Sequence, residues 1–520
     1  MTVLRAASFA ALLLLCSVLG AVAEDVTLTS RDGSVEIAGN LLSFDGEFYR
    51  VDTIYGVLTV DGSGVLCDGP GCPDLQAFVA EFEIAGSRTM GEVLVPALVE
   101  AFAARNGYAV QRSVISDTKF GYTLVETDSD RPAARIGFHV TSTDEGFADL
   151  LANEADLVLS TRPVTAQEIQ LARDAGLGNL GDPRRSRIVG LDALVPVVAS
   201  GNPADALSLE TLAEIFAGEV DNWQAVGGED APILLHLRDD LSGAAREFLR
   251  QVLLPYNKTL AGSVARHANN LSLVEAVSRD PHALGIASFS ELGNTRALEV
   301  AGACRKGTVA SPVTIKTQDY PLVTPLFVYT PARRLSVLAR EFLSYIRSGP
   351  AQPVVTRAGF VDLRLQQIPT LRQGDRISSA VLSAGEETKL PEVQRLVRRM
   401  QGTARLTLNF RFASGTELDA QSLSNVDILA REIEAGAFYG RKLIFVGFSD
   451  GEGDAAANLR LARTRARTVR NAVLTNAVTA DRDRLTLSTD AFGEAMPLAC
   501  DDSDWGRRIN RRVEVWVDQM

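Results

Sequence analysis

The segment LSLETLAEIFAGEVDNWQAVGG, residues 207–228, decides how the middle of this chain is interpreted. Within it LETLAEIFAG predicts a helix, and the strand-like run IVGLDALVPVVAS comes before it. The strand-like run APILLHLR and the helical run AAREFLRQVLL follow it. The same alternation continues outward from about residue 80 to about residue 350, and alternating strands and helices predict an α/β architecture.

Hydroxyl side chains stand at four junctions between a predicted strand and the next predicted helix: Ser87 with Thr89, Thr143, Ser160 with Thr161, and Ser242. Helix N-termini offer unpaired N–H groups and the positive end of the helix dipole, so several that converge bind an anion without a metal. Gly243 lets the backbone approach a ligand closely. Arg238, four residues before Ser242, supplies a charge and a fork of donors suited to a tetrahedral oxyanion.

Taken singly, each hydroxyl is better explained as a helix cap, and Arg238 as a surface charge. Their joint order, together with the 207–228 segment and Arg238-x-x-x-Ser242-Gly243, resembles the phosphate-binding proteins of ABC phosphate importers. The resemblance covers about residues 80–350 and implies a two-lobed periplasmic binding protein fold, type II-like, that closes on its ligand by a hinge. The ligand-contacting residues that it implies are Thr89, Met90 (through its amide), Thr143, Thr161, Arg238, Ser242 and Gly243.

The chain departs from that family's pattern at two positions. Ala244 stands where the motif ends in Thr, and Thr161 stands where some members place an Asp that accepts the proton of hydrogenphosphate. Phosphate is therefore expected but not demanded, and sulfate or a related anion remains open. Residues 113–136 have the character of an insertion without an assigned role.

The last part of the chain, about residues 403–520, has the alternation β-α-β-α-β and carries the segment GFSDGEGDAAANLRLARTRARTVRNAV. This segment is similar to the core motif of the OmpA family, with Asp450, Asn458 and Arg465 in register. The resemblance implies an α+β domain that binds peptidoglycan. It also implies that Asp450 takes the ammonium, and Arg465 the carboxylate, of the diaminopimelate in the stem peptide.

Helical periodicity supports this independently. Ala462, Ala466 and Val469 fall on one apolar face of the predicted helix, and Arg465 alone among the helix arginines lies on that side. An arginine near a core must be paired or bind something, because an unpaired buried charge is costly. A purely structural salt bridge between Arg465 and Asp450 is the alternative.

The remaining segments complete the predicted domain organisation. Residues 1–23 read as a secretory signal peptide, 24–78 as a small β-rich module with hairpin turns, 79–355 as the two-lobed domain, and 356–402 as a linker with a helix. Export permits a disulfide between Cys67 and Cys72, which flank a Gly-Pro-Gly turn. Nothing in the sequence pairs Cys304 or Cys500.

Composition and motifs narrow the function. The net charge of −13 argues against a nucleic-acid partner, and neither metal-ligand spacing nor a nucleophile–base–acid motif is present. We therefore expect a non-enzymatic periplasmic receptor for phosphate or a similar oxyanion, without cofactor, associated with the cell wall or outer membrane through peptidoglycan. An ABC permease or another envelope protein is an expected partner. The alternative is a wall-bound scaffold or sensor whose lobes contact a protein instead of an anion.

Overall fold

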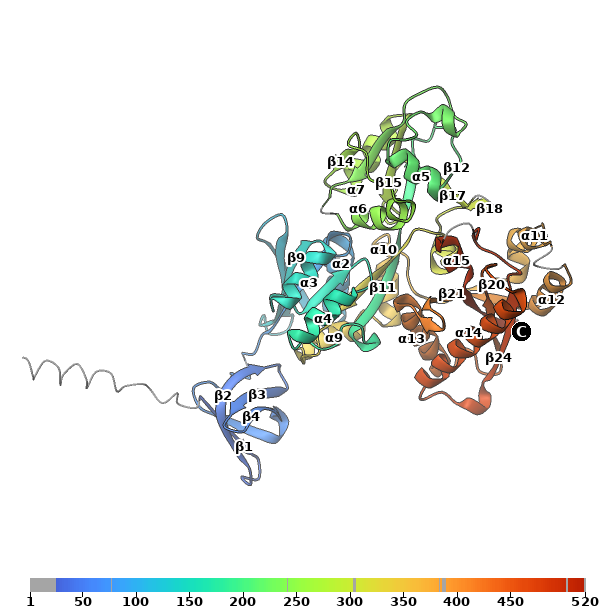
Figure 1. Ribbon diagram of the computed structural model, residues 1–520. Helices are drawn as coiled ribbons and strands as arrows, with labels where there is room; N and C mark the ends of the chain where they lie inside the picture. The colour runs from blue at the N-terminus through green and yellow to red at the C-terminus, as the bar shows by residue number, and fades with distance from the viewer. Residues whose placement is uncertain are drawn as a thin grey trace, which may run out of the picture.

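The computed structural model describes residues 25–75, 77–240, 242–302, 305–382, 384–385, 390–501 and 504–518. The predicted signal peptide and Cys304 lie outside these residues. The chain forms an N-terminal strand module, a two-lobed α/β domain and a C-terminal α+β domain, which follow one another in sequence (Figure 1). Within the described residues, no helix combines the length and the apolar character needed to cross a bilayer.

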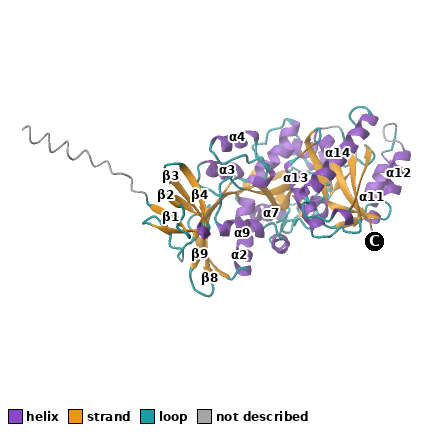
Figure 2. Ribbon diagram, turned by 90° about the horizontal axis from the view of Figure 1, so that it is seen from below, coloured by secondary structure: helices purple, strands orange, loops and turns teal. Residues whose placement is uncertain are grey.

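The N-terminal module is a sheet of five strands in the order β4-β3-β2-β1-β5 (Figure 2). Its strands are β1 (Val26–Ser30), β2 (Glu36–Phe44), β3 (Phe48–Thr53), β4 (Gly56–Asp61) and β5 (Val65–Asp68). Cys67 and Cys72 form a disulfide with a Cα–Cα distance of 5.8 Å. The module contacts the two-lobed domain through Glu47, which pairs with Arg334 and Arg340 at 2.6 Å each.

The two-lobed domain is built on one continuous sheet in the order β14-β13-β15-β11-β19-β10-β6-β9-β8-β7. The first lobe contains β6 (Ala80–Ser87), β7 (Tyr108–Val114), β8 (Lys119–Glu126), β9 (Pro132–Thr141), β10 (Leu157–Ser160) and β19 (Val323–Tyr329). Its helices are α2 (Val95–Arg105), which continues the π-helical turn Met90–Leu94, α3 (Thr143–Leu151), α4 (Ala166–Asp174), α9 (Val337–Tyr345) and α10 (Gln352–Arg357). The predicted insertion 113–136 supplies most of the β7–β8 hairpin, which extends the edge of this sheet beyond β9.

The second lobe contains β13 (Leu234–Arg238), β14 (Ala265–His267), β15 (Ala283–Ser288), α5 (Leu209–Phe216), α6 (Gly243–Phe248) and α7 (Asn270–Arg279). A small sheet of β12 (Ala206–Ser208), β17 (Glu299–Gly302) and β18 (Arg305–Thr308) lies beside it, with the short strand β16 (Arg296–Ala297) and helix α8 (Pro312–Lys316).

Strand β11 (Ser186–Val198) joins the two lobes. Its residues 186–193 pair with β19 of the first lobe, and its residues 194–198 pair with β15 of the second. The sequence explains this length, because IVGLDALVPVV is an apolar run suited to burial on both faces. β11 is therefore the hinge strand of the domain.

The C-terminal domain is a sheet in the order β20-β21-β25-β23-β24, covered by helices on both faces. Its strands are β20 (Gln367–Pro369), β21 (Thr403–Ser414), β22 (Glu417–Leu418), β23 (Lys442–Phe448), β24 (Thr486–Gly493) and β25 (Arg512–Asp518). Its helices are α11 (Gly374–Leu382), α12 (Leu390–Met400), α13 (Ala420–Glu434), α14 (Ala455–Asn476) and α15 (Asp504–Asn510). Alternate side chains of β23 point to opposite faces, so Phe445 packs under α13 and α14 while Val446 packs under α11 and α12.

The segment 356–402, expected to be a linker, has a different role in the structure. Helices α11 and α12 bury Ala380, Val393 and Leu396 against Phe448 and Trp516 of the C-terminal sheet. Apolar residues at positions 393, 396 and 400 form a narrow stripe on an otherwise charged helix. The segment is therefore a structural layer of the C-terminal domain.

The C-terminal domain attaches to the two-lobed domain where the chain leads into β19. Arg405 of β21 is 1% exposed and binds Asp319 with two hydrogen bonds of 2.7 and 3.0 Å. Arg411 donates to the carbonyl oxygen of Gln318 at 2.7 Å, and Asn409 donates to that of Thr317. The attachment thus lies a few residues from the hinge.

Candidate functional site

The predicted anion-contacting residues come from both lobes, and Thr143, Thr161 and Gly243 lie together where the lobes face each other. Gly243, at the start of α6 in the second lobe, lies directly against the first lobe. A Cβ atom added to it would lie 3.1 Å from Thr161 Oγ1 and 3.6 Å from Ser87 Oγ, both in the first lobe. The lobes are therefore closed on each other at this point, and a side chain at position 243 would occupy space between them.

Two of the predicted hydroxyls contact each other at this place. Thr143 Oγ1 lies 3.4 Å from Thr161 Oγ1 and accepts a hydrogen bond of 3.2 Å from the Thr161 backbone N–H. Both residues are buried, at 5% and 4% exposure. Ser242 is also buried, and its Oγ accepts from the N–H of Ala244 at 3.2 Å, as an N-cap of α6.

Several polar atoms in or next to the predicted residues are buried without a hydrogen-bond partner among the described residues. They are Ser87 Oγ, Arg238 Nε and Asp239 Oδ1. Arg238, at the end of β13, is 6% exposed, and its Nη2 donates to the Ala268 carbonyl at 3.0 Å. Burial lowers the pKa of its guanidinium, which means that the charge is held at a desolvation cost. Native proteins pair nearly all buried polar groups, so such a cluster indicates a place for a ligand.

The remaining predicted residues are at the start of the first helix of the domain. Met90 is fully buried, and Thr89 is half-buried one residue before it. Helical structure begins at residue 88, so the amides of this first turn have no intrahelical acceptor.

Two junctions differ in detail from the expectation. Thr161 does not stand at a helix N-terminus, because α4 begins only at Ala166, and Thr165 and Glu168 form its capping box. At α3 the cap is Ser142, whose Oγ accepts from the Glu145 N–H at 3.2 Å, and this leaves the Thr143 hydroxyl free to meet Thr161. The helix dipole of α4 is therefore not part of this site.

An ion pair connects the two lobes in the closed arrangement, and no sequence pattern indicated it. Asp144 of α3 pairs with Arg162 of its own lobe and with Arg246 of α6 in the other lobe. Burial raises the pKa of Asp144, but the two arginines hold it below its ordinary value. Asp240, the other carboxylate close to the motif, pairs with Arg266.

The second candidate site lies in the C-terminal domain, between the end of β23 and helix α14. Arg465 is 3% exposed, stacks over the Phe412 ring at 5.1 Å, and donates from Nε to the Gly415 carbonyl at 2.9 Å. Its Nη1 atom is buried with no hydrogen-bond partner among the described residues. Burial lowers the pKa of Arg465, and Arg511 adds to this.

Asp450 is 6% exposed, and its Oδ2 also has no hydrogen-bond partner within the described part of the chain. Its ion pair is with Arg511, at 3.3 Å, and not with Arg465. Burial raises the pKa of Asp450 in spite of the nearby Arg511. The structural salt bridge that was the alternative for Arg465 and Asp450 is therefore not formed.

Asn458 holds the loop that carries Asp450. Its Nδ2 donates to the carbonyl oxygens of Asp450 at 3.2 Å and Glu452 at 2.9 Å, and to Glu494 Oε1 at 2.8 Å. Arg511 is the residue that sequence reasoning missed at this site. It belongs to the run GRRINRR, where four arginines are indistinguishable until the fold turns one of them toward Asp450.

Cys500 is disulfide-bonded, although nothing in the sequence indicated a partner for it.

Comparison with known proteins agrees with this geometry. A family model described as a PBP superfamily domain matches residues 74–349, more than half of the chain, and an OmpA family model matches residues 411–511. The chain therefore belongs to the PBP superfamily. It carries a domain like those of phosphate-binding proteins, with the two-lobed α/β fold, followed by an OmpA domain.

Individual relatives are distant. Protein SphX of Synechococcus elongatus is 27% identical over 238 residues, 43% of this chain and 68% of that protein. Phosphate-binding protein PstS of Borreliella burgdorferi is 22% identical over 237 residues, 44% of this chain and 80% of that protein. Probable lipoprotein YiaD of Escherichia coli is 37% identical over 75 residues, 14% of this chain and 32% of that protein.

Among solved structures, a putative phosphate ABC transporter substrate-binding protein with bound phosphate, from Clostridium perfringens, is similar with a TM-score of 0.41. It is 19% identical, and the alignment covers 55% of this chain and all of that one.

Proposed function

We propose that this protein is a non-enzymatic periplasmic receptor for phosphate or a similar tetrahedral oxyanion, held at the cell wall by its OmpA domain. One observation carries the first half of the proposal. The buried hydroxyl of Ser87 in the first lobe, unpartnered among the described residues, lies beside Gly243 of the second lobe, where any side chain would fill the space. Arg238 of the second lobe also has a buried Nε atom without a partner in the described part of the chain, and its guanidinium interacts electrostatically with Arg88 and Glu92 of the first lobe.

An oxyanion supplies the hydrogen-bond acceptors and the negative charge that these buried polar groups lack. The guanidinium of Arg238 is desolvated, and a charged ligand between the lobes restores the hydrogen bonds that water gave it. Hydroxyl donors from Thr143, Thr161 and Ser242 are the kind that hold an anion without a metal. The names of the relatives, phosphate-binding protein PstS among them, agree with this ligand class.

The wall-binding half rests on Asp450, Arg465 and Arg511. Arg465 and Asp450 are both nearly buried, and each keeps an atom without a hydrogen-bond partner among the described residues. A zwitterion such as diaminopimelate offers an ammonium to Asp450 and a carboxylate to Arg465, so one ligand compensates both. Attachment is then reversible and involves no covalent bond.

Titration calorimetry of the mature full-length chain with phosphate tests the receptor function. Wild-type protein should bind, and Arg238→Ala should weaken binding by about 2–5 kcal/mol, because a charge-assisted contact to a buried anion is lost. Arg463→Ala removes the same charge from the exposed face of α14 and should leave the affinity unchanged. Wild-type protein that gives neither heat nor a thermal shift with millimolar phosphate, sulfate, arsenate or molybdate would favour the scaffold alternative.

A further inference from the structure

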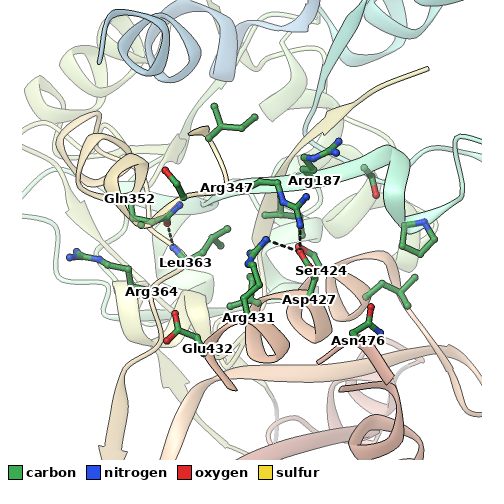
Figure 3. Close-up of a pocket in the computed structure, with 18 of the residues that line it drawn as sticks. Arg187, Arg347, Gln352, Leu363, Arg364, Ser424, Asp427, Arg431, Glu432 and Asn476 are labelled. Atoms are coloured by element: carbon green, nitrogen blue, oxygen red, sulfur yellow. Dashed lines mark hydrogen bonds and ion pairs between the residues drawn. The ribbon is translucent and has the colours of Figure 1, made fainter. Parts of the chain in front are cut away.

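A cavity of ≈500 Å³ lies between the first lobe and helix α13 of the C-terminal domain, away from the cleft between the lobes (Figure 3). Its lining side chains come from the start of β11, from the segment after α9, and from α13. Figure 3 shows Arg347 from the two-lobed domain and Arg431 from α13 pointing toward Asp427.

The lining is rich in positive charge. The five arginines of the lining are Arg184, Arg187, Arg347, Arg364 and Arg431, against the two carboxylates Asp427 and Glu432. Asp427 is shared, because it pairs with Arg347 at 2.7 Å and with Arg431 at 2.9 Å. Arg184 and Arg364 pair with Asp182 and Asp362 outside the lining. Arg187 is therefore the lining arginine that has no ion pair in the described part of the chain.

Arg187 is the uncompensated member. It is half-buried, and its Nε and Nη1 atoms are fully buried without a hydrogen-bond partner in the described part of the chain. Burial lowers the pKa of Arg187, and the neighbouring Arg347 lowers it further. A desolvated cation beside other cations is costly to the folded protein unless an anion joins it.

A second hollow of ≈610 Å³ shares Arg187, Arg347 and Arg431 with this cavity, and Arg340 is added to its lining. Arginines thus line both the cavity and the space next to it.

We propose that the cavity between the two domains is a second anion site, which takes a compact multivalent anion of the oligophosphate type. A volume of this size lies in the range of about 300–1,000 Å³ that holds whole small-molecule ligands. A single tetrahedral oxyanion would leave most of it to water, whereas a chain of phosphate groups can reach Arg187, Arg347 and Arg431 together. Arginine is the residue best suited to such groups, because its planar fork matches two oxygens at once.

Calorimetry with sodium tripolyphosphate on the mature full-length chain tests this site. The Arg238→Ala background removes the binding group of the cleft, so the remaining heat reports the cavity. Adding Arg187→Met should weaken tripolyphosphate binding at least about tenfold, and Arg463→Ala in the same background should not change it. Inorganic phosphate should bind the Arg238→Ala protein more weakly than tripolyphosphate does, because it reaches fewer arginines.

A stability measurement separates ligand binding from a structural role of Arg187. Without anion, Arg187→Met should melt at the same temperature as the parent protein or higher, since an uncompensated buried cation is removed. It should also lose the upward shift that tripolyphosphate gives the parent. Absence of tripolyphosphate binding in the Arg238→Ala protein, an unchanged affinity in Arg187→Met, or a sharp fall in its melting temperature would each overturn the proposal. None of these outcomes bears on phosphate binding by the wild-type cleft, which is measured separately.

Discussion

At the level of single residues, the proposed anion site distinguishes phosphate from sulfate only if a nearby carboxylate can accept a proton. Asp144 and Asp240 are both neutralised by arginines. Asp239 follows Arg238 directly, and its Oδ1 is buried without a hydrogen-bond partner among the described residues. We therefore predict that Asp239 accepts the proton of monohydrogen phosphate, the role that the family gives to an Asp at the position of Thr161.

Asp239→Asn should accordingly narrow the preference for phosphate over sulfate by about tenfold or more, equivalent to about 1.4 kcal/mol. An amide cannot accept a proton as a carboxylate does, and it can donate to a fully ionised anion. Competition calorimetry at pH 7 measures the ratio, with Asp230→Asn as a control on an exposed loop of the same lobe. Sulfate that competes equally with phosphate in wild-type protein would show that no residue accepts the proton.

Asp450 and Arg465 allow a second prediction about single residues. Asp450→Ala and Arg465→Ala should each fail to co-sediment with purified peptidoglycan sacculi, since each removes the partner of one end of a zwitterion. Both variants should keep a cooperative melt, because neither residue is ion-paired to the other in the folded protein. Arg463→Ala serves as the matched control and should pellet normally.

Loss of folding with sacculus binding retained by the folded remainder would assign Asp450 and Arg465 a structural role. Wild-type protein that does not pellet at all would remove the wall from the proposal.

In both sites the sequence predicted the position of a residue on its own element, but it did not predict the contacts between distant elements. Helical spacing placed Arg465 on the apolar face of α14, and the structure buries it there at 3% exposure. Spacing could not reveal that Asp450 pairs with Arg511, because that contact depends on how the chain enters β25. The same holds for Arg246, which reaches Asp144 only because the lobes are closed.

At the level of elements, the pairing of Asp144 with Arg246 connects α3 of one lobe to α6 of the other. Asp144→Asn should therefore shift the protein slightly toward an open form and weaken phosphate binding by about twofold to fivefold, because an ion pair with side chains 55% and 40% exposed contributes at most about 1 kcal/mol to the closed form. Small-angle scattering without phosphate should give a larger radius of gyration than for wild-type protein.

Glu145→Gln changes an exposed acid one residue away on the same helix and should have no effect. An Asp144→Asn protein with unchanged scattering and unchanged affinity would show that this ion pair does not hold the lobes.

The C-terminal sheet contains a buried carboxylate that makes its stability depend on pH. Glu514 of β25 is fully buried and pairs with Arg376 at 2.5 Å, Arg405 at 3.3 Å and Arg512 at 2.8 Å. Burial raises the pKa of Glu514, but these arginines lower it from 4.5 to about 2.

A lowered pKa in the folded state stabilises the fold above the unfolded value and loses that effect as pH falls toward the folded value. Melting of the C-terminal domain, followed by circular dichroism, should therefore be constant near neutral pH and fall steeply between about pH 4.5 and pH 2. A melting temperature that stays level through this range would contradict the assigned charge state of Glu514.

The prediction of helices and strands from the sequence succeeded where the hydrophobic periodicity was strong. It failed where charged residues obscured that periodicity. The alternation of strands and helices from residue 80 onward and the helix over 455–474 are present in the structure. α12 was expected to belong to a linker because LPEVQRLVRRM is dominated by charged residues, and its stripe of Val393, Leu396 and Met400 is narrow. The need for this stripe follows from the sheet: Trp516 and Phe448 are buried by α11 and α12 and would be exposed without them.

At the level of the whole molecule, the three parts differ in how they are joined. The N-terminal module contacts the first lobe through Arg334 and Arg340, whose side chains are 40% and 37% exposed, so these ion pairs contribute little stability. The C-terminal domain is joined by the buried contact of Arg405 with Asp319. The C-terminal junction is thus the rigid one.

The position of that junction has a mechanical consequence. Asp319 lies just before β19, beside the strand about which the lobes turn, so the C-terminal domain is mounted at the pivot. If the wall holds this domain, as proposed, tension in the wall reaches the receptor where the lever arm is shortest. Such a force exerts almost no torque on the lobes and does little work along their opening. Ligand occupancy would then follow the anion concentration and stay independent of turgor.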